Sequence, residues 1–291
     1  MPSFDDLARR LDAAARSLDG RLDEAGSLEG YPLFRLVFGE PAGPPILLDA
    51  GIHGEEPAGP LGLAAWLDTR AGHWSRRFRF TVLPCLNPWG FEHGTRSSRD
   101  TEDLNRHFDE PDAPLTRLVA HALGGARQSL ACDLHEDVDF DSCYLYELKA
   151  APPFAGERLL AAAAAFVPVS NGDAVGEFRT AHGLIRPPAG ILRPAERRGW
   201  PIAIYHFATG CAHVVTMEAP GRRPLETRIA IHRAVLDAAC GFAGDGTEKV
   251  AAPNAPGVTG GGAPSVAPPG PGGVTAGGAP SVAPPGPGGV E

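Results

Sequence analysis

Apolar residues along this chain change repeatedly between a helical and a strand spacing. From Ser3 to Gly20 they recur every three or four residues, which predicts a helix with Ser3 as its N-cap. Residues 78–86 alternate apolar and polar side chains, which predicts a strand. The same reasoning predicts helices at 58–69, 115–123, 156–166 and 225–240, strands at 33–38, 45–49, 130–134, 144–148, 201–207 and 213–217, and a turn at 87–90.

Predicted strands and helices interleave along most of the chain. Such an order is typical of an α/β fold in which helices connect neighbouring parallel strands. We therefore expect a mixed, largely parallel central sheet flanked by helices. A folded part of about 245 residues suits one domain of this kind.

The amino-acid composition changes near the end of the chain. Residues 257–272 recur at 273–288 with one change, Gly260 to Ala276, as a 16-residue repeat of Pro, Gly, Ala, Val, Ser and Thr. Few of these side chains could bury a core, so the entropy of ordering the segment would not be offset. We expect a folded domain at 1–245 and a disordered tail at 246–291, which either lacks a function or binds a partner through its prolines.

Charge and cysteine usage exclude several classes of protein. The formal net charge is −9, from 26 basic and 35 acidic residues, and no basic stripe is present for phosphates, which argues against nucleic-acid binding. No basic segment leads into an apolar run, and no stretch approaches the roughly 18 apolar residues of a membrane span. Five scattered cysteines without a C-x-x-C pair favour reduced, buried thiols. A cytoplasmic protein that binds no membrane is expected.

Polar clusters follow the predicted strands where each strand ends. His53 and Glu56 come after residues 45–49, in a turn whose glycines permit a sharp bend. In sheets of this kind ligands gather outside the carboxyl ends of the strands. The other clusters in such positions are Arg96 with Arg99, Asp103 to Arg106, Asp133 to His135, and Thr216 to Glu218.

These residue types favour metal-assisted hydrolysis. Two imidazoles (His53, His135) and one carboxylate (Glu56) are the ligand set of a catalytic zinc, which lowers the pKa of water and polarises a carbonyl. Glu218 is the candidate to move the proton from water to the leaving nitrogen. An arginine near the carbonyl would stabilise an oxyanion, and Asn105 with Arg106 could hold a substrate carboxylate.

The motifs taken in order resemble a known family. They are H-G-x-E at His53, N-P-x-G-F at Asn87, T-R at Thr95, D-L-N-R at Asp103, D-L-H at Asp133 and T-x-E-x-P-G at Thr216, between residues 45 and 221. The series resembles the zinc carboxypeptidase family, including its short bacterial members and the related succinylglutamate desuccinylase and aspartoacylase branch.

The resemblance implies a zinc carboxypeptidase-like fold and one Zn²⁺ per chain, with a role for each motif residue. His53, Glu56 and His135 would bind zinc, and Glu218 would act as general base and acid. Asp103 would orient His53 through its other ring nitrogen. Asn105 and Arg106 would bind the substrate carboxylate. Arg96 would polarise the carbonyl and Arg99 would contact the substrate, with Arg99 as the rival of Arg96 for the polarising role.

Three alternatives stay open. The resemblance favours a metallocarboxypeptidase that cleaves an amide or peptide bond next to a free carboxylate by metal-activated water, but an N-acyl amino acid deacylase carries the same motifs. A binding module without catalysis is the second alternative, and Glu55 in place of Glu56 as ligand is the third. The digestive carboxypeptidases of this family carry a tyrosine about twenty residues before the general base, and no tyrosine stands there before Glu218. A role for a phenol is therefore open to Tyr144, Tyr146 or Tyr205. We interpret the remaining histidines as structural or exposed, with His93 nearest the site.

Overall fold

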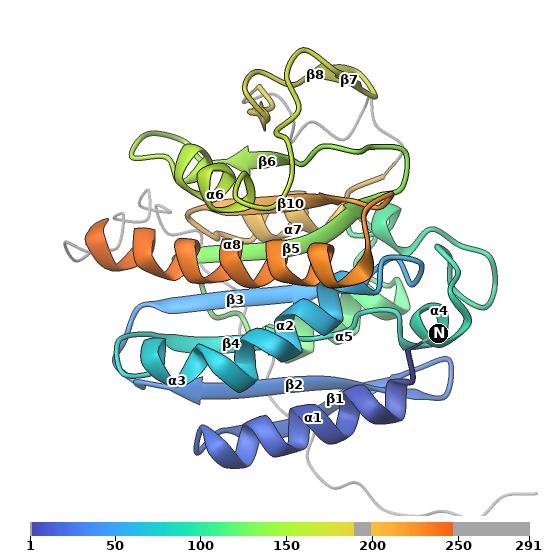
Figure 1. The fold of residues 1–291 in the computed structure, drawn as a ribbon. Helices are drawn as coiled ribbons and strands as arrows, with labels where there is room; N and C mark the ends of the chain where they lie inside the picture. Colours follow the sequence, from blue (N-terminus) through green and yellow to red (C-terminus); the bar gives the residue numbers. More distant parts are fainter. Residues whose placement is uncertain (1, 189–198, 247–291) are drawn as a thin grey trace, which may run out of the picture. The chain divides into compact units, whose positions relative to one another are not determined.

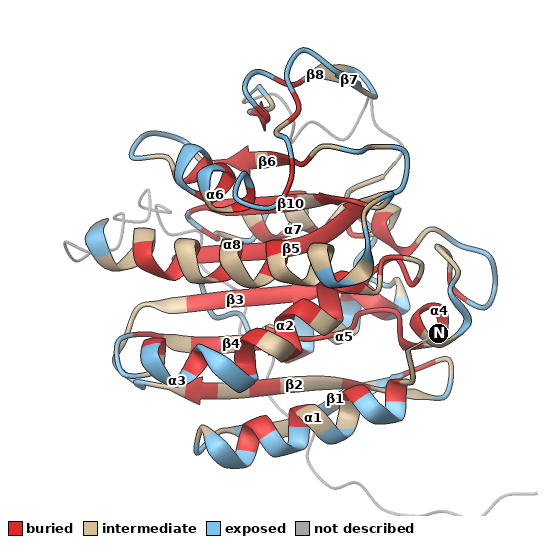
Figure 2. Ribbon diagram, viewed as in Figure 1, coloured by how far each residue is buried: buried red, intermediate tan, exposed pale blue. Residues whose placement is uncertain are grey.

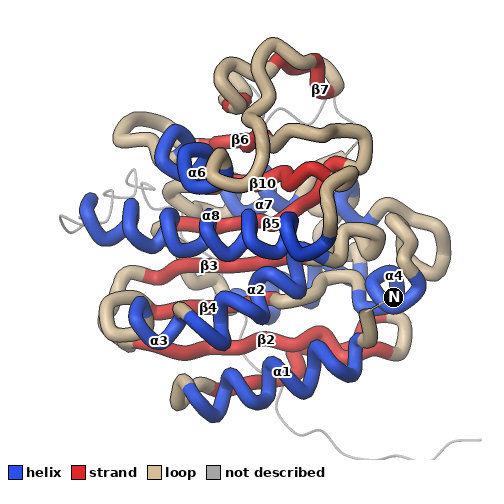
Figure 3. The backbone as a smooth tube through the Cα atoms, viewed as in Figure 1, coloured by secondary structure: helices blue, strands red, loops and turns tan. Residues whose placement is uncertain are grey.

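The computed structural model describes residues 2–188 and 199–246. An eight-stranded sheet forms the centre of this part of the chain, and helices cover both of its faces (Figures 1 and 3). This is the expected fold class. The predicted tail and its repeat lie outside the described residues.

The strand order of the sheet is β1-β2-β4-β3-β5-β10-β6-β9. The inner pairs β4/β3, β3/β5 and β5/β10 are parallel, as is β6/β9, whereas β1/β2, β2/β4 and β10/β6 are antiparallel. The strand bounds are β1 Arg21–Leu28, β2 Tyr31–Gly39, β3 Pro45–Ala50, β4 Arg79–Leu83, β5 Leu130–Asp137, β6 Tyr144–Leu148, β9 Leu184–Ile185 and β10 Val214–Pro220, with β7 Ala174–Val175 and β8 Phe178–Arg179 in a separate small hairpin.

Helices lie in two layers. The helix bounds are α1 Phe4–Ser17, α2 Ala58–Thr69, α3 Ala71–Trp74, α4 Pro88–His93, α5 Pro114–Leu123, α6 Gly156–Ala163, α7 Ile202–Ala208 and α8 Leu225–Gly246, with a short 3₁₀ turn at Leu104–Arg106. Residues of α1, α2, α6 and α8 share one buried core with the sheet, and residues of α5 and α7 share the other. Figure 1 shows the first group in front of the sheet and the second behind it.

Alternation along the strands assigns each residue to one of these cores. In β3 the side chains of Ile46 and Leu48 enter the α2/α8 core, whereas Leu47 enters the α5/α7 core. Both faces of the inner strands are therefore buried (Figure 2), which explains why these strands read as nearly continuous apolar runs. A polar side chain within such a run is buried and therefore needs a hydrogen-bonding or charged partner.

Two sequence predictions were wrong in type. Residues 87–90 begin α4 instead of a turn: Asn87 Oδ1 accepts from the backbone N–H of Gly90 as an N-cap, and Pro88 occupies the first helical turn, where its missing N–H costs nothing. Residues 201–207 form α7 instead of a strand. A short apolar run of this length does not distinguish a buried helix from a strand, and Pro201 precedes α7 as its N-terminal cap residue.

Other differences concern length. β5 and β10 extend past their predicted ends, so His135 and Glu218 lie within strands instead of after them. The polar edge strand β1 and the two-residue strands β7, β8 and β9 carry too weak a pattern to be predicted. All five cysteines are buried and free, as expected. None of the helices within residues 2–188 and 199–246 has the length and apolar character that a membrane crossing requires.

Candidate metal and substrate site

The turn between β3 and α2 carries the first two candidate ligands. Gly51 has a φ of +68°, a conformation that favours glycine. A Cβ on Gly54 would lie only 1.9 Å from the carbonyl carbon of Gly90, so this turn packs directly on the backbone of α4. The backbone N–H of Glu56 donates to the carbonyl of His53 over 3.2 Å, which brings the two side chains to the same side of the turn.

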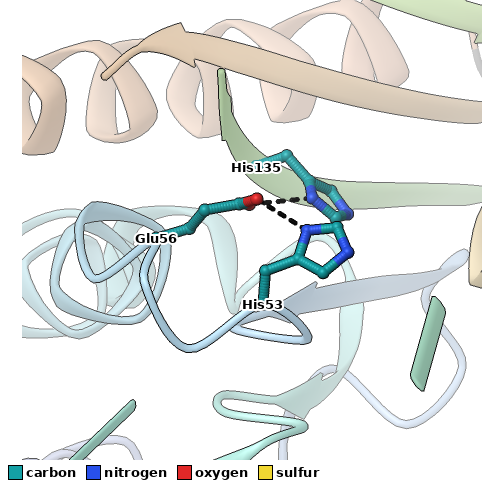
Figure 4. A group of neighbouring side chains, drawn as sticks. All are labelled: His53, Glu56 and His135. Atoms are coloured by element: carbon teal, nitrogen blue, oxygen red, sulfur yellow. Dashed lines mark hydrogen bonds and ion pairs between the residues drawn. The ribbon is translucent and has the colours of Figure 1, made fainter. Parts of the chain in front are cut away.

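His53, Glu56 and His135 converge, although β5 supplies the third residue (Figure 4). Glu56 Oε1 lies 2.6 Å from His53 Nδ1, and Glu56 Oε2 lies 2.9 Å from His135 Nδ1. One potential ligand atom from each residue lies within 4.8 Å of the others, and all three residues are buried. Among the residues that the structure describes, this is the group found able to hold a metal ion.

Charge in this group matches a cation site. Burial alone would raise the pKa of Glu56, but His135 and His53 hold it well below its usual range. For His135, burial would lower the pKa, yet Asp133 and Glu56 raise it well above the ordinary histidine value. Positive charge is thus stabilised where the three side chains meet. Two imidazoles and one carboxylate are also the donor types that zinc prefers in catalytic sites, so the residues present fit this metal.

An aspartate contacts the far nitrogen of each imidazole. Asp103 Oδ1 lies 3.4 Å from His53 Nε2, the contact that was expected from the D-L-N-R motif. Asp133 Oδ2 lies 3.2 Å from His135 Nε2. A carboxylate at this position fixes the tautomer and leaves Nδ1 free to bind a metal. No role was predicted for Asp133, although D-L-H in a strand places Asp133 and His135 on the same face.

Arg96 and Arg99 lie in different surroundings. The Nε and Nη2 atoms of Arg96 donate to Asp103 Oδ2 over 3.3 and 3.2 Å, and its Nη1 lies 3.6 Å from Glu56 Oε1. Arg99 is exposed, its backbone N–H donates to Glu29, and it does not line the cavity described below. The structure therefore brings Arg96, but not Arg99, to the candidate metal position.

Asn105 and Arg106 lie beside the same site. Asn105 is buried, and its Oδ1 accepts from the backbone N–H of Ile202 over 2.8 Å, which fixes the amide against the start of α7. Arg106 Nη1 donates to the carbonyl of Asn105 over 2.7 Å. Part of the Arg106 guanidinium stays available to a ligand, since its side chain is 42% exposed.

Glu218 faces the candidate ligands from β10, where it pairs in register with His135 of β5. Burial raises the pKa of Glu218 to about 8; His135 opposes this shift, and the carboxylates of Glu56 and Asp137 add to it. Near neutral pH this carboxyl group can both accept and return a proton, which is the property required of a general base and acid. A cation nearby would favour its ionised form.

One cavity of about 910 Å³ joins these groups. Its lining includes the three candidate ligands, Arg96, Asn105, Arg106 and Glu218. It also includes Tyr144 and Tyr146, whereas Tyr205 is not among the lining residues. The Tyr144 hydroxyl donates to Asp137 Oδ2 over 2.6 Å. Glu55 lines the cavity as well, but its carboxylate is not part of the converging group.

The remaining histidines do not join the three ligands. His93, expected to be nearest the site, is exposed, stacks on Trp89 and does not line the cavity. His206 and His213 are buried and paired with Asp49 and Glu147. Burial lowers the pKa of His232 to about 3, so this histidine between α8 and α2 is neutral.

Comparisons with known proteins show which sequences and folds this chain is similar to. Residues 42–186 match the model of the succinylglutamate desuccinylase/aspartoacylase catalytic domain. A solved structure from Shewanella amazonensis SB2B, provisionally named a metallopeptidase, has 27% sequence identity and a TM-score of 0.71, and the comparison covers 80% of this chain and 90% of that one. A search among curated proteins gave no match.

More distant structures share the fold. The metallo-carboxypeptidase from Burkholderia cenocepacia has 21% identity and a TM-score of 0.61, over 82% of this chain and 68% of that one. The metallo-carboxypeptidase from Pseudomonas aeruginosa, solved with (2-guanidinoethylmercapto)succinic acid, has 19% identity and a TM-score of 0.61, over the same two shares.

Fold and site together define an enzyme of the hydrolase type built around a candidate metal centre. More particularly, the chain belongs to a zinc carboxypeptidase-like family that is related to the succinylglutamate desuccinylase/aspartoacylase catalytic domain.

Proposed function

We propose that this protein is a zinc-dependent hydrolase of the metallocarboxypeptidase type, which cleaves an amide or peptide bond next to a free carboxylate. The observation that carries the proposal is the convergence of His53, Glu56 and His135 within 4.8 Å, in the same cavity as Glu218 and Arg106. A ligand set, a proton carrier and a carboxylate-binding cation in one cavity are the parts that this reaction requires.

His53, Glu56 and His135 would hold one Zn²⁺. When bound, zinc lowers the pKa of water and polarises the carbonyl that is attacked. Asp103 Oδ1 and Asp133 Oδ2 lie 3.4 and 3.2 Å from the Nε2 atoms of His53 and His135, so that the Nδ1 atoms of both rings are directed at Glu56. These contacts orient the ligands before substrate enters.

Glu218 takes the proton from the attacking water and passes it to the leaving nitrogen. Its carboxyl group projects from β10 beside His135, within the cavity. The pKa of about 8, raised chiefly by burial, supports a group that holds the proton between the two transfers.

Arg96 stabilises the developing oxyanion, and Asn105 with Arg106 binds the free carboxylate of the substrate. Arg96 is anchored by Asp103, so its guanidinium does not have to be ordered during the reaction. The fork of the Arg106 guanidinium suits a carboxylate, and its position fixes which bond lies at the metal.

Cleavage of N-acyl amino acids is the second candidate. The match of residues 42–186 to the succinylglutamate desuccinylase/aspartoacylase domain favours it, whereas the 27% identity to a protein provisionally named a metallopeptidase favours peptides. Both reactions use the same metal site, and in both Asn105 and Arg106 bind the carboxylate of the substrate. The reactions differ only in the acyl group that is cleaved from the amino acid: a peptide in one and a simple acyl group in the other.

A substrate screen with zinc-loaded protein tests the proposal and separates the candidates. Zinc content is measured by elemental analysis, and hydrolysis is followed for dipeptides, N-acyl amino acids and peptidoglycan fragments. We expect one zinc per chain and hydrolysis of peptides with a free C-terminal carboxylate, lost with chelator and after amidation of that carboxylate. Cleavage of N-acyl amino acids alone would favour the deacylase, and bound zinc without turnover would contradict a hydrolase.

A further inference from the structure

Side chains on the α5/α7 face of the sheet form rows that run across the strands. Leu47, Ala131, Val214 and Leu148 are aligned by the register of β3, β5, β10 and β6, and all are buried apolar residues. Two residues further along each strand, toward the cavity, the aligned residues are Asp49, Asp133, Thr216 and Tyr146. The next row contains His135, Glu218 and Tyr144. A polar row thus lies between the apolar core and the candidate site.

Three members of a buried polar group connect the site to α7. His206 Nε2 lies 2.7 Å from Asp49 Oδ2, and Asp133 Oδ2 lies 3.2 Å from His135 Nε2. Asp49 and Asp133 are neighbours in register on β3 and β5, so their side chains lie side by side on the same face of the sheet. Asp49, Asp133 and His206 are at most 1% exposed. Two contacts and one register pair thus link α7 to a candidate ligand.

The two adjacent carboxyl groups each keep one oxygen without another partner. The Oδ1 atoms of Asp49 and Asp133 accept no hydrogen bond from other described groups. Burial raises the pKa of Asp49 to about 6. A proton on Asp49 that is donated to Asp133 would join the two side chains.

We propose that His206 and Asp49 are positioning residues for the metal centre: they hold Asp133 in place, and Asp133 fixes the ring of His135 with its Nδ1 directed at the metal position. The inference rests on the proposed zinc site and adds two residues to it. α7 also supplies Ala203 and Ile204 to the cavity wall, so the same contact joins the wall to the ligand.

A second buried histidine and carboxylate pair provides the matched control. His213 Nε2 lies 2.8 Å from Glu147 Oε1, and Glu147 also accepts from the backbone N–H groups of Ala155 and Gly156 and from Arg186. His213 packs on Phe242 of α8, on the other side of the sheet. Within the described part of the chain, the contacts of this pair lead to no candidate ligand. Loss of this pair should therefore affect stability without changing metal binding.

The test compares zinc affinity, measured by competition with a chelator, in His206→Leu, His206→Gln and His213→Leu. His206→Leu removes the contact to Asp49, and we expect zinc affinity to fall about tenfold or more. His206→Gln can place an amide donor near the position of Nε2, so it should restore most of the affinity. His213→Leu should lower the melting temperature but leave zinc affinity within about twofold of the unaltered protein.

Substitutions of Asp49 give an independent measurement. Asp49→Asn keeps one acceptor for His206 and one donor for Asp133, and should retain zinc affinity. Asp49→Leu keeps neither the acceptor nor the donor and should lose zinc affinity. The visible absorption spectrum of the cobalt(II)-substituted protein should change in the variants that lose affinity and not in Asp49→Asn or His213→Leu, because it reports the geometry of the ligands.

The outcomes separate this inference from the proposed function. If the unaltered chain binds no zinc, the metal site itself is refuted. If it binds zinc and His206→Leu has the same affinity and cobalt spectrum, the positioning role is refuted and the zinc site stands. If His206→Leu and Asp49→Leu do not fold, His206→Gln and His213→Leu are compared: a lower zinc affinity or an altered cobalt spectrum in His206→Gln alone supports the positioning role, and no difference between the two variants refutes it.

Discussion

At the scale of single residues, the candidate site combines groups that motifs name with groups that only contacts reveal. His53, Glu56, His135 and Glu218 could each be identified from short motifs. Asp133 is the partner of His135 because a strand returns to the same face every second residue. The chemistry thus depends on residues beside each motif as much as on the motif itself.

Substitution of Glu218 separates catalysis from metal binding. Glu218→Gln removes the proton carrier and is expected to lower kcat by about 10²–10⁴-fold, with zinc content unchanged, because Glu218 is not one of the three converging residues. Glu55→Gln, which alters another carboxylate at the cavity, is the control and should stay within a few-fold of normal activity. Full activity of Glu218→Gln would exclude Glu218 as the base.

The two arginines of the long loop make a second matched pair. Arg96→Ala removes the guanidinium beside Glu56 and should lower kcat by about 10²–10³-fold. Arg99→Ala changes an exposed side chain away from the cavity and should leave kcat and KM unchanged. Steady-state kinetics of both variants on the best substrate decide the assignment, and the reverse order of effects would transfer the role to Arg99.

At the scale of elements, the site depends on how closely a few segments approach one another. The His53 to Glu56 turn packs on α4, and α7 binds Asn105 through its first backbone N–H. Both elements had been predicted as other structures, a turn and a strand. Local sequence patterns identify short apolar segments poorly, whereas packing against the sheet selects the helix.

Gly54 tests the contact between the turn and α4. In Gly54→Ala the new Cβ would lie 1.9 Å from backbone of Gly90, so the turn or α4 has to move. We expect a loss of about 1–3 kcal/mol in unfolding free energy, together with weaker zinc binding. Gly72→Ala is the control, since its Cβ meets only Leu18 at an ordinary 3.7 Å. Equal stability and zinc affinity in both variants would contradict this close packing.

Glu147 anchors β6 to the segments around it and gives a pH prediction. Burial opposes ionisation, but hydrogen bonds from His213 and Arg186 lower the pKa of Glu147 to about 2. A depressed folded pKa stabilises the protein above the unfolded value of about 4.3, and this contribution is lost as pH falls from there toward 2. Its size at pH 7 is about 3 kcal/mol.

Urea unfolding of Glu147→Gln measures this contribution. The variant should be less stable than the unaltered protein at pH 7, and the difference should narrow between pH 4.5 and pH 3. Glu157→Gln serves as control, because Glu157 is an exposed partner of the same Arg186. A difference that stays constant over this pH range would show that ionisation of Glu147 is not the cause.

At the scale of the whole molecule, the metal site joins parts of the chain that are distant in sequence. The turn after β3 supplies His53 and Glu56, whereas β5 supplies His135 after a separation of about eighty residues. The edge of the sheet brings these segments together because parallel strands end on the same side. A bound cation would therefore cross-link the centre of the domain.

Removal of zinc should lower the stability of the domain. Binding to the folded state alone contributes about 4 kcal/mol when free zinc is a thousand times its Kd, which corresponds to a rise in Tm of roughly 10 °C. Thermal unfolding with and without chelator measures the effect. His135→Ala should show no difference between the two conditions. A Tm of the unaltered protein that does not depend on zinc would contradict the site.

The sequence alone determined the fold class, most inner strands and the identity of the candidate ligands. Periodicity indicates which faces of the strands and helices are buried. The motifs H-x-x-E and D-L-H combine residue types that few functions other than metal binding require together. Tertiary structure alone decided the type of α4 and α7, the positions of Arg96 and Arg99, and the link from His206 through Asp49 to Asp133. The physical reason is that these features depend on contacts between segments far apart in the chain. Such contacts produce no periodic or local pattern in the sequence.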